Sequence, residues 1–477
     1  MQSYIDTFTL LYDALAEDIL AWCPSLVQDV ERDLSRLHIS VQRDGLSFMT
    51  ITHGHMEKAF LKALSGEVDL GTASQLVRGM GSKKRGLDVR PRYMHGLFSM
   101  IFDDQGTLRP DVDPVAVFFL RQWFSLAKKI EIECTPIRVS HSIDDWISVD
   151  EKLPIHHPNT WDDDAPVWQR RLGHPLFGRI ENELPSLFGE DQEPIDCGPK
   201  WTLLWELFAL ITGTLGILDP WTIRPKHGPG ATADRDGLKY EFRNWPAKLQ
   251  SIFPWDFFAT PDLGVYRRES GTEPVQREVP CVMSAVPKTQ EAPRLIAIEP
   301  IAHQWIQGGI QRWFEDQVEQ SWLSNFIDFR NQSKSQRLAR WSSLTGECAT
   351  VDLSAASDRV STRLVEYAFQ TNPGLLDALH ACRSRLVKLP DGTLHRMRKF
   401  APMGSAVCFP VQTIVFTGIA LASVALTRGL TPREAIEASA GYVQVFGDDI
   451  IIPVDSYPAL VAILTDLGLK VNEAKSY

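Results

Sequence analysis

The chain has 477 residues, of which 44% are hydrophobic and 23% are charged. This composition excludes a disordered chain and a small disulfide-rich scaffold, and the length suffices for two or three hydrophobic cores. Lysine and arginine number 49 against 60 aspartates and glutamates, so the formal net charge is −11. Taken alone, this acidic charge argues against a protein that coats nucleic acid, because such proteins are usually basic.

The cysteines and the N-terminus indicate an intracellular protein. The seven cysteines are scattered and none belongs to a CxxC pair, so we expect a reducing compartment and neither a zinc site nor a disulfide framework. The first twenty residues carry Asp6, Asp13, Glu17 and Asp18, whereas a secretory signal begins with basic residues. We therefore predict an amphipathic helix there.

The first two-thirds of the chain predict helices on either side of a loop-rich connection. Residues 1–150 form a helical N-terminal region, 151–200 a proline-rich acidic connection, and 201–345 a mixed region. Apolar residues that recur every three or four positions, together with turn signals, give the elements in order. They are helices at 6–22, 56–65, 115–129 and 201–218, two strands joined by a loop within 280–300, and a helix at 301–317.

Residues 346–477 change character, because short strands now alternate with helices. The predicted elements are a strand ending at 353, helices at 362–370 and 375–386, a hairpin around 390–392, helices at 408–428 and 431–440, a hairpin at 443–453, a helix at 458–467 and a strand at 469–472. This order predicts an α+β fold with helices behind an antiparallel sheet.

The stretch 401–427 contains no charged residue and is long enough to span a membrane. It nevertheless contains Pro410, Gln412, Thr413 and Thr417, and neither end carries the tryptophan or tyrosine that anchors membrane helices. We therefore predict a helix buried in a large soluble domain, with no membrane partner.

The strongest local signal is Gly447-Asp448-Asp449, between two runs of β-forming residues. Glycine suits a tight turn and lets another segment approach closely. Two adjacent carboxylates at a hairpin tip repel each other, so a bound cation is the natural counter-charge. The alternative is an ordinary turn, in which aspartate is common.

A second group of carboxylates lies in the segment Val351 to Asp358. Asp352 ends an apolar strand, and Asp358 stands where a helix is expected to begin. Mg²⁺ prefers carboxylate and phosphate oxygens, and two such ions about 4 Å apart can activate a hydroxyl and stabilise a leaving pyrophosphate. Asp352 and Asp448, on neighbouring strands, would supply that site. Asp358 is alternatively only the N-cap of its helix.

Two further segments have the chemistry of a nucleotide site. Gly404 and Ser405 open the apolar helix and would allow close contact with a sugar–phosphate backbone, although the loop could equally serve only to start a core helix. Lys288 and Arg294 are cations in an otherwise apolar segment. They could hold a triphosphate, since arginine can bond two oxygens at once, or they could be surface charges.

Five motifs occur in a fixed order between Val286 and Tyr477: VPKTxxxPRxIAIEP, VDLSAASD, MGSxxxFPVQ, FGDD and VNxAK. This ordered set resembles the RNA-directed RNA polymerases (the catalytic, or beta, subunit of the replicase) of single-stranded RNA bacteriophages. Arg90-Pro91-Arg92 and the segment His227 to Thr232 are also similar to stretches in that family. The resemblance implies a right-hand polymerase with helical, loop-rich fingers mostly before Gly346, and 201–345 is the part of the fingers that carries the nucleotide-entry motif. It also implies an antiparallel-sheet palm at 346–477 and a polymerase catalytic domain at about 322–463. The motifs of a thumb are missing, so the resemblance also implies a truncated thumb.

The resemblance also implies roles for single residues. Asp352, Asp448 and Asp449 match the aspartates that bind two Mg²⁺ ions, with Mn²⁺ as a possible substitute, and Asp448 is the closer ligand of the pair. The expected nucleotide-binding residues are Lys288 and Arg294 on the entry path, Asp358 and Ser405 at the ribose, and Gly404 beside them. Lys475 matches a proton donor to pyrophosphate. Cys408 and Gln412 depart from the family, which usually has a hydroxyl and an amide there.

The function implied is copying of a phage RNA genome from nucleoside triphosphates in the cytoplasm of a bacterial host. The expected partners are RNA template and product, nucleoside triphosphates, host elongation factors Tu and Ts, and a ribosomal protein. The alternatives are a polymerase of the narnavirus type and a truncated RNA-binding protein that keeps the fold without catalysis. A net charge of −11 is compatible with all three, because RNA would meet only a channel and bound magnesium would neutralise some of the acid.

Overall fold

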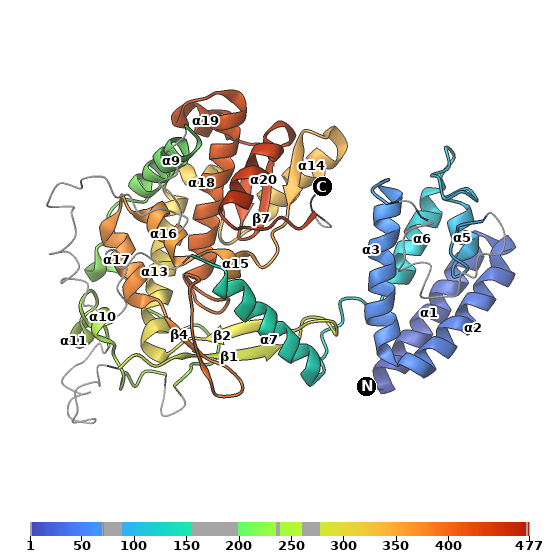
Figure 1. The fold of residues 1–477 in the computed structure, drawn as a ribbon, viewed down its shortest axis with the longest axis horizontal. Coiled ribbons are helices and arrows are strands. Elements are labelled where there is room, and N and C mark those ends of the chain that lie inside the picture. Colours follow the sequence, from blue (N-terminus) through green and yellow to red (C-terminus); the bar gives the residue numbers. More distant parts are fainter. Residues whose placement is uncertain are drawn as a thin grey trace. The chain divides into compact units, whose positions relative to one another are not determined.

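The computed structural model describes residues 2–68, 70, 88–154, 199–234, 239–259, 277–473 and 476. Contacts divide the chain into two compact units (Figure 1). The first comprises Met1–Ile143 with Ala285–Arg294, and the second comprises Asp144–Ser284 with Leu295–Tyr477. The finer division into fingers and palm stays a prediction.

The first unit is helical, as the periodicity predicted. Its helices are α1 (Gln2–Trp22), α2 (Val27–Asp44), α3 (His53–Leu64), α5 (His95–Ser99) and α6 (Pro114–Ser125), with short η1 (Pro24–Leu26) and a π-helical turn η2 (Phe48–Thr52). Helix α7 (Pro136–Glu151) begins in this unit and ends in the second. Tyr12, Ala16 and Ile19 are the buried residues of α1, so one stripe of that helix faces the core.

The core of the first unit contains a hydrogen-bonded aromatic network. Tyr12 Oη lies 2.9 Å from His53 Nδ1, Tyr93 Oη lies 3.1 Å from His53 Nε2, and Trp123 Nε1 donates to Tyr93 Oη at 2.8 Å. Burial lowers the pKa of His53 to about 3, so the ring is neutral in the fold. The network satisfies polar groups that burial would otherwise leave unpaired.

The second unit contains two sheets and the remaining helices. Its helical segments are α9 (Pro199–Leu215), η3 (Pro220–Thr222), α10 (Ala247–Gln250), α11 (Trp255–Phe258), α13 (Ile301–Glu319), η4 (Trp322–Asn325), α14 (Ser333–Thr345), α15 (Ala356–Arg359), α16 (Thr362–Phe369), α17 (Pro373–Cys382), α18 (Cys408–Arg428), α19 (Pro432–Ser439), η5 (Val454–Ser456) and α20 (Tyr457–Asp466). Its strands include β1 (Cys281–Val286) and β2 (Arg294–Ile298), which start or end at the boundary of the first unit, then β3 (Cys348–Val351), β4 (Leu386–Lys388), β5 (Leu394–Arg396), β6 (Gln444–Phe446) and β7 (Asp449–Pro453).

Helix α18 is the central element of the second unit and has the bounds that its sequence predicted. It packs against α9, α19 and α20 (Figure 1). In the described part of the chain, only α18 has the length and apolarity of a membrane-spanning helix, and 89% of its most apolar window is buried inside the protein. Burial in the core therefore accounts for its lack of charge.

The two sheets have the strand orders β2-β1-β4-β5 and β3-β7-β6. In the first, β1 and β4 are parallel while β4 and β5 form the predicted hairpin. The second is antiparallel throughout, as predicted. It shows Val351 paired with Ile450 and Phe446 paired with Asp449.

Several predicted boundaries were wrong; for example, helix α6 ends at Ser125 and not at 129. Helix α17 ends at Cys382 and not at 386, because the buried Arg383 is extended and its guanidinium donates to the carbonyls of Met397, Lys399 and Phe400. The predicted strand at 469–472 is reduced to a single antiparallel bridge between Leu353 and Val471.

Candidate active site

The predicted metal-binding aspartates gather at one end of the three-stranded sheet. Asp352 follows Val351, the last paired residue of β3, and continuation of the register sets it opposite Asp449. Gly447 and Asp448 form the two-residue turn that joins β6 to β7. Asp448 and Asp449 are exposed, and Asp352 is half-buried. Local strand pairing therefore brings together carboxylates that are almost 100 residues apart in sequence.

These carboxylates suit a magnesium ion that is also bound by water and substrate phosphates better than a metal ion whose ligands are all protein side chains. Among the described residues, no three His, Cys, Asp or Glu side chains converge closely enough to hold an ion. Mg²⁺, however, is usually bound by one or two carboxylates together with water and substrate phosphates. Exposed carboxylate oxygens at a sheet end supply that part of the coordination shell and leave room for a triphosphate.

The hairpin tip is fixed against α18. Gly447 has φ 65, and an added Cβ would come within 2.6 Å of the Phe409 ring, so only glycine fits this approach. The amide of Gly447 donates to Thr413 Oγ1 at 3.1 Å. Gln412 lies against the same tip, and burial raises the pKa of the Cys408 thiol to about 12. Gln412, one of the two residues that depart from the family pattern, thus belongs to the helix surface under the tip.

Asn472 is a site residue that the sequence reasoning missed. Its backbone N–H donates to Asp352 O at 2.8 Å, and its side-chain Nδ2 donates to Asp352 Oδ2 at 2.7 Å. The amide of Ser354 also donates to Lys470 O, so the segment before Asn472 runs along the Asp352 strand. The available signal was that Asn472 belongs to the VNxAK motif.

Asp358 does not have the N-cap role offered as its alternative. It lies inside the short helix α15, whose N-cap is Ala355, a residue with φ 53 and no side-chain capping bond. The Asp358 carboxylate instead accepts a hydrogen bond from Lys399 Nζ at 2.9 Å. Lys399 is a second residue that the sequence reasoning missed.

Gly404 and Ser405 precede α18, and they differ in what they contact: Gly404 packs on a strand, whereas Ser405 is a buried residue. Gly404 has φ 117, and an added Cβ would overlap the carbonyl oxygen of Ala297 in β2, so close packing on that strand requires glycine here. Ser405 is 7% exposed. Its Oγ has no hydrogen-bond partner within the described residues, so a buried hydroxyl is available to a ligand.

Lys288 and Arg294 belong to the first unit, whereas the aspartates belong to the second. Their loop is anchored at Gln290, whose side chain accepts from Thr50 Oγ1 at 2.5 Å and whose carbonyl accepts from Arg138 at 2.9 Å. Glu291 pairs with His55 at 2.9 Å. These contacts fix the loop that carries both predicted triphosphate ligands.

Lys475, the predicted proton donor, lies outside the described residues. Its role stays a prediction.

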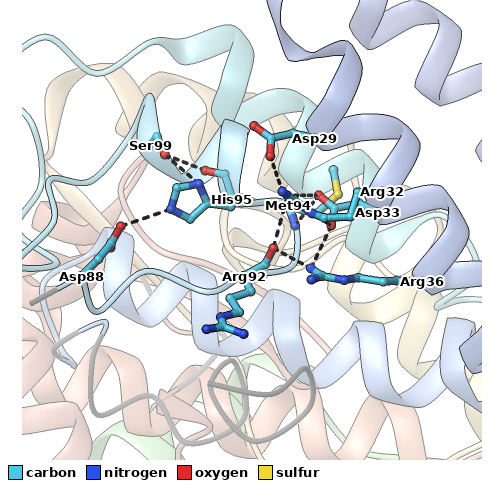
Figure 2. Close-up of polar contacts among 9 residues, drawn as sticks. All are labelled: Asp29, Arg32, Asp33, Arg36, Asp88, Arg92, Met94, His95 and Ser99. Carbon is cyan, nitrogen blue, oxygen red and sulfur yellow. Dashed lines mark hydrogen bonds and ion pairs between the residues drawn. The ribbon is translucent and has the colours of Figure 1, made fainter. Parts of the chain in front are cut away.

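The Arg90-Pro91-Arg92 segment leads into a turn held by Asp33 (Figure 2). The buried Asp33 carboxylate accepts from the Met94 amide at 2.9 Å, and Met94 has φ 58. Arg36 donates to Asp33 at 3.3 Å and to the Arg92 carbonyl at 2.8 Å. Burial raises the pKa of Asp33 to about 6 although its arginine neighbours lower it.

Figure 2 also shows His95 beside the carboxylate of Asp88, which precedes this turn. Arg90 donates to Asp88 through both Nε and Nη2, at 2.9 and 2.7 Å, and His95 Nε2 lies 3.2 Å from the same carboxylate. These hydrogen bonds, above all those of Arg90, hold the pKa of Asp88 well below its usual value. Arg90 is therefore a structural part of this turn.

The comparisons with known proteins concern the C-terminal part of the chain. Residues 269–477 match the family described as RNA replicase, beta-chain. Over 192 residues the chain is 35% identical to the RNA-directed RNA polymerase subunit beta of Escherichia virus Qbeta, which covers 40% of this chain and 30% of that relative. It is 36% identical to the same subunit of Enterobacteria phage SP and 32% identical to the beta chain of Escherichia phage MS2, again over 192 residues and 40% of this chain. These stretches cover 31% and 32% of the two relatives.

A solved structure, the RNA-dependent RNA polymerase of BmCPV at the elongation state, is 13% identical with a TM-score of 0.35, over 57% of this chain and 26% of that chain. The matched segment spans about a third of the length of the curated relatives. Over residues 269–477 the chain is therefore similar to the RNA replicase beta-chains of RNA phages, which confirms the resemblance that the five ordered motifs indicated.

Proposed function

We propose that this chain carries the catalytic aspartates of an RNA-directed RNA polymerase and extends an RNA strand on an RNA template, with release of pyrophosphate. The observation that supports the proposal best is the strand register that brings Asp352 to the Gly447-Asp448-Asp449 tip. Both lie inside the segment that matches phage replicase beta-chains.

The residues at the sheet end suit nucleotidyl transfer. Asp352, Asp448 and Asp449 would hold two Mg²⁺ ions, for which Mn²⁺ could substitute. When bound, these ions would favour ionisation of the attacking 3′-hydroxyl and offset charge on the leaving pyrophosphate. The hydrogen bond from Asn472 orients the Asp352 carboxylate, and the hydrogen bond from Gly447 to Thr413 ties the turn that carries Asp448 to α18.

Other residues of the chain would bind and orient the nucleotide. Lys288 and Arg294 would pair with the triphosphate, and Asp358 and Ser405 would contact the ribose, with the Gly404 turn bringing Ser405 into place. Lys475 would donate a proton to the pyrophosphate. Most of the rate enhancement in such phosphoryl transfers comes from positioning and charge neutralisation.

The proposed partners follow from the same assignment. They are an RNA template and product and nucleoside triphosphates, and further host elongation factors Tu and Ts and a ribosomal protein. The proposed location is the cytoplasm of an infected bacterium.

Primer extension on an RNA template with Mg²⁺ and nucleoside triphosphates tests the proposal. Asp448→Asn should lower incorporation by more than about a hundredfold, because loss of a direct metal ligand exceeds the 10–100-fold effect of an outer-shell partner. Asp466→Asn is the matched control, since Asp466 is an exposed residue that forms a surface ion pair with Lys200, and it should leave the rate within about twofold.

Incorporation by Asp448→Asn at the unchanged rate would contradict the proposal. RNA binding without any product from the unchanged chain would instead favour a non-catalytic RNA-binding protein of this fold.

A further inference from the structure

Lys399 is a fully buried cation beside the predicted ribose site. Its side chain is 0% exposed, and its Nζ lies 3.5 Å from the centroid of the Trp146 ring. Two carboxylates neighbour it: Asp358 Oδ1 at 2.9 Å and Asp150 Oδ1 at 3.9 Å. A buried ammonium costs several kcal/mol unless it is paired, so this arrangement needs a compensating role.

Asp150 is already satisfied by other donors. His395 Nε2 lies 2.8 Å from Asp150 Oδ2, and the backbone amides of Arg398 and Lys399 donate to the carboxylate at 3.0 and 2.9 Å. Burial raises the pKa of Asp150, but these donors and the Lys399 charge outweigh it and hold the pKa below its usual value. The ammonium of Lys399 is therefore directed to Asp358.

The Asp358 carboxylate, in contrast, accepts a hydrogen bond from one side chain of the described residues, that of Lys399. Helix α15 has four residues and no side-chain cap, so it does little to fix the carboxylate. Within the described part of the chain, Lys399 is the hydrogen-bond partner of Asp358 Oδ1, and Oδ2 has none. The Asp358 side chain is 23% exposed, so one oxygen is held from inside and the other can meet a ligand.

The backbone keeps Lys399 in register with α15. The amide of Thr362 donates to Arg398 O at 2.9 Å, and the amide of Phe400 donates to Val360 O at 2.9 Å. These two bonds lie on either side of the bridge between Ser361 and Lys399. The segment before α18 is thus tied directly to the segment after Asp358.

We propose that Lys399 is the positioning residue for ribose selection: its buried ammonium fixes the Asp358 carboxylate so that the remaining oxygen accepts a hydrogen bond from the 2′-hydroxyl of the incoming nucleotide. This inference rests on the proposed polymerase function. A site built to bond a hydroxyl rejects an analogue that lacks it only if the acceptor is held in place, because a mobile carboxylate would turn to water instead.

The test is the ratio of kcat/KM for a nucleoside triphosphate to kcat/KM for the matching deoxynucleoside triphosphate. Lys399→Met keeps the apolar stem and removes the charge, and should lower this ratio by about tenfold, the size of one hydrogen bond to a charged group. The loss should fall mainly on the ribonucleotide. Lys388→Met, at an exposed lysine of β4, is the control and should keep the ratio unchanged.

A double-mutant cycle separates positioning from a merely structural role. Asp358→Asn should lower the ratio, and Lys399→Met added to it should lower the ratio little further, because both act on one hydrogen bond. Additive losses, or an unchanged ratio in folded Lys399→Met, would overturn the inference. If Lys399→Met does not fold, Lys399→Gln, which keeps a donor without the charge, takes its place with the same criterion.

Equilibrium binding of the two nucleotides is measured beside turnover. A chain that makes no product but prefers the ribonucleotide, and loses that preference in Lys399→Met, would reject the polymerase activity and retain the inference. A chain with neither product nor preference would overturn both.

Discussion

At the scale of single residues, the carboxylates of the candidate site depend on side chains far away in sequence. Asn472 reaches Asp352 over 120 positions, and Lys399 reaches Asp358 over 41. Both partners donate to a carboxylate oxygen, and Lys399 adds the charge of its ammonium to its hydrogen bond. A carboxylate that loses the side chain donating a hydrogen bond to it keeps its charge, but its orientation is no longer fixed.

Asn472→Ala should therefore raise the Mg²⁺ concentration for half-maximal incorporation by about tenfold, the low end of the effect of outer-shell partners. The measurement is a magnesium titration of primer extension at saturating nucleotide. Glu473→Gln, at the exposed neighbour of Asn472, is the control and should leave the titration unchanged. The same midpoint in both variants would show that the Asn472 amide does not orient Asp352.

At the scale of elements, α18 packs so closely on α9 that side-chain size is limited at their crossing. Gly418 of α18 faces the buried Phe208 of α9, and an added Cβ would overlap the Phe208 ring. The ring lies in a filled core and has little room to move, since dense interiors resist added volume. This packing supports the helix surface on which the Gly447 tip lies.

Gly418→Ala should lower the free energy of unfolding by about 1–3 kcal/mol, the usual cost of overpacking. Gly213→Ala is a matched control within α9, because an added Cβ there meets nothing within 4 Å. It should stabilise the protein by about 0.5–1 kcal/mol, as alanine loses less entropy than glycine in a helix. Denaturant unfolding measures both. Equal effects of the two substitutions would contradict the packing argument.

At the scale of the whole molecule, the described residues form a hydrophobic core in each of the two units. The net charge of −11 is spread over a surface in which many carboxylates have local partners. Asp33 also has local partners, but its side chain is 2% exposed and its arginine neighbours lie at 3.3 Å or more, so burial outweighs them. Its ionisation therefore costs stability in the first unit.

Because the folded pKa of Asp33 is about 6 and its ordinary value is 3.8, the folded chain binds this proton more tightly than the unfolded chain. The stability contributed by protonated Asp33 should be fully present below about pH 4 and lost as pH rises through about 6. The unfolding free energy of the unchanged chain minus that of Asp33→Asn should thus fall with pH over this window. Asp111→Asn, at an exposed aspartate whose Arg109 partner lowers its pKa, should give a small change of opposite sign. A flat difference curve for Asp33→Asn would refute the prediction.

Much of the fold could be predicted from local patterns. The bounds of α18, the hairpin with Gly447 at its tip and the presence of helices α1, α3 and α6 follow from apolar periodicity and turn residues, which act over a few positions. The alternative prediction that Asp358 is the N-cap of its helix was wrong, because Ala355 has that position in α15. Ala355 has a left-handed backbone conformation, which no pattern of side chains in the sequence indicates. The helix predicted to reach 386 was cut short by Arg383, whose partners lie at Met397 to Phe400.

The sequence by itself determined the resemblance to phage replicase beta-chains: the three aspartates, their motifs and the order of those motifs are all readable without coordinates. Only the tertiary structure decided which groups hold these aspartates and which unit carries each segment. It paired Asn472 with Asp352 and Lys399 with Asp358, and it assigned the Lys288 loop to the first unit. The physical reason is that burial and charge pairing act between residues that folding brings together, whereas periodicity records only neighbours along the chain.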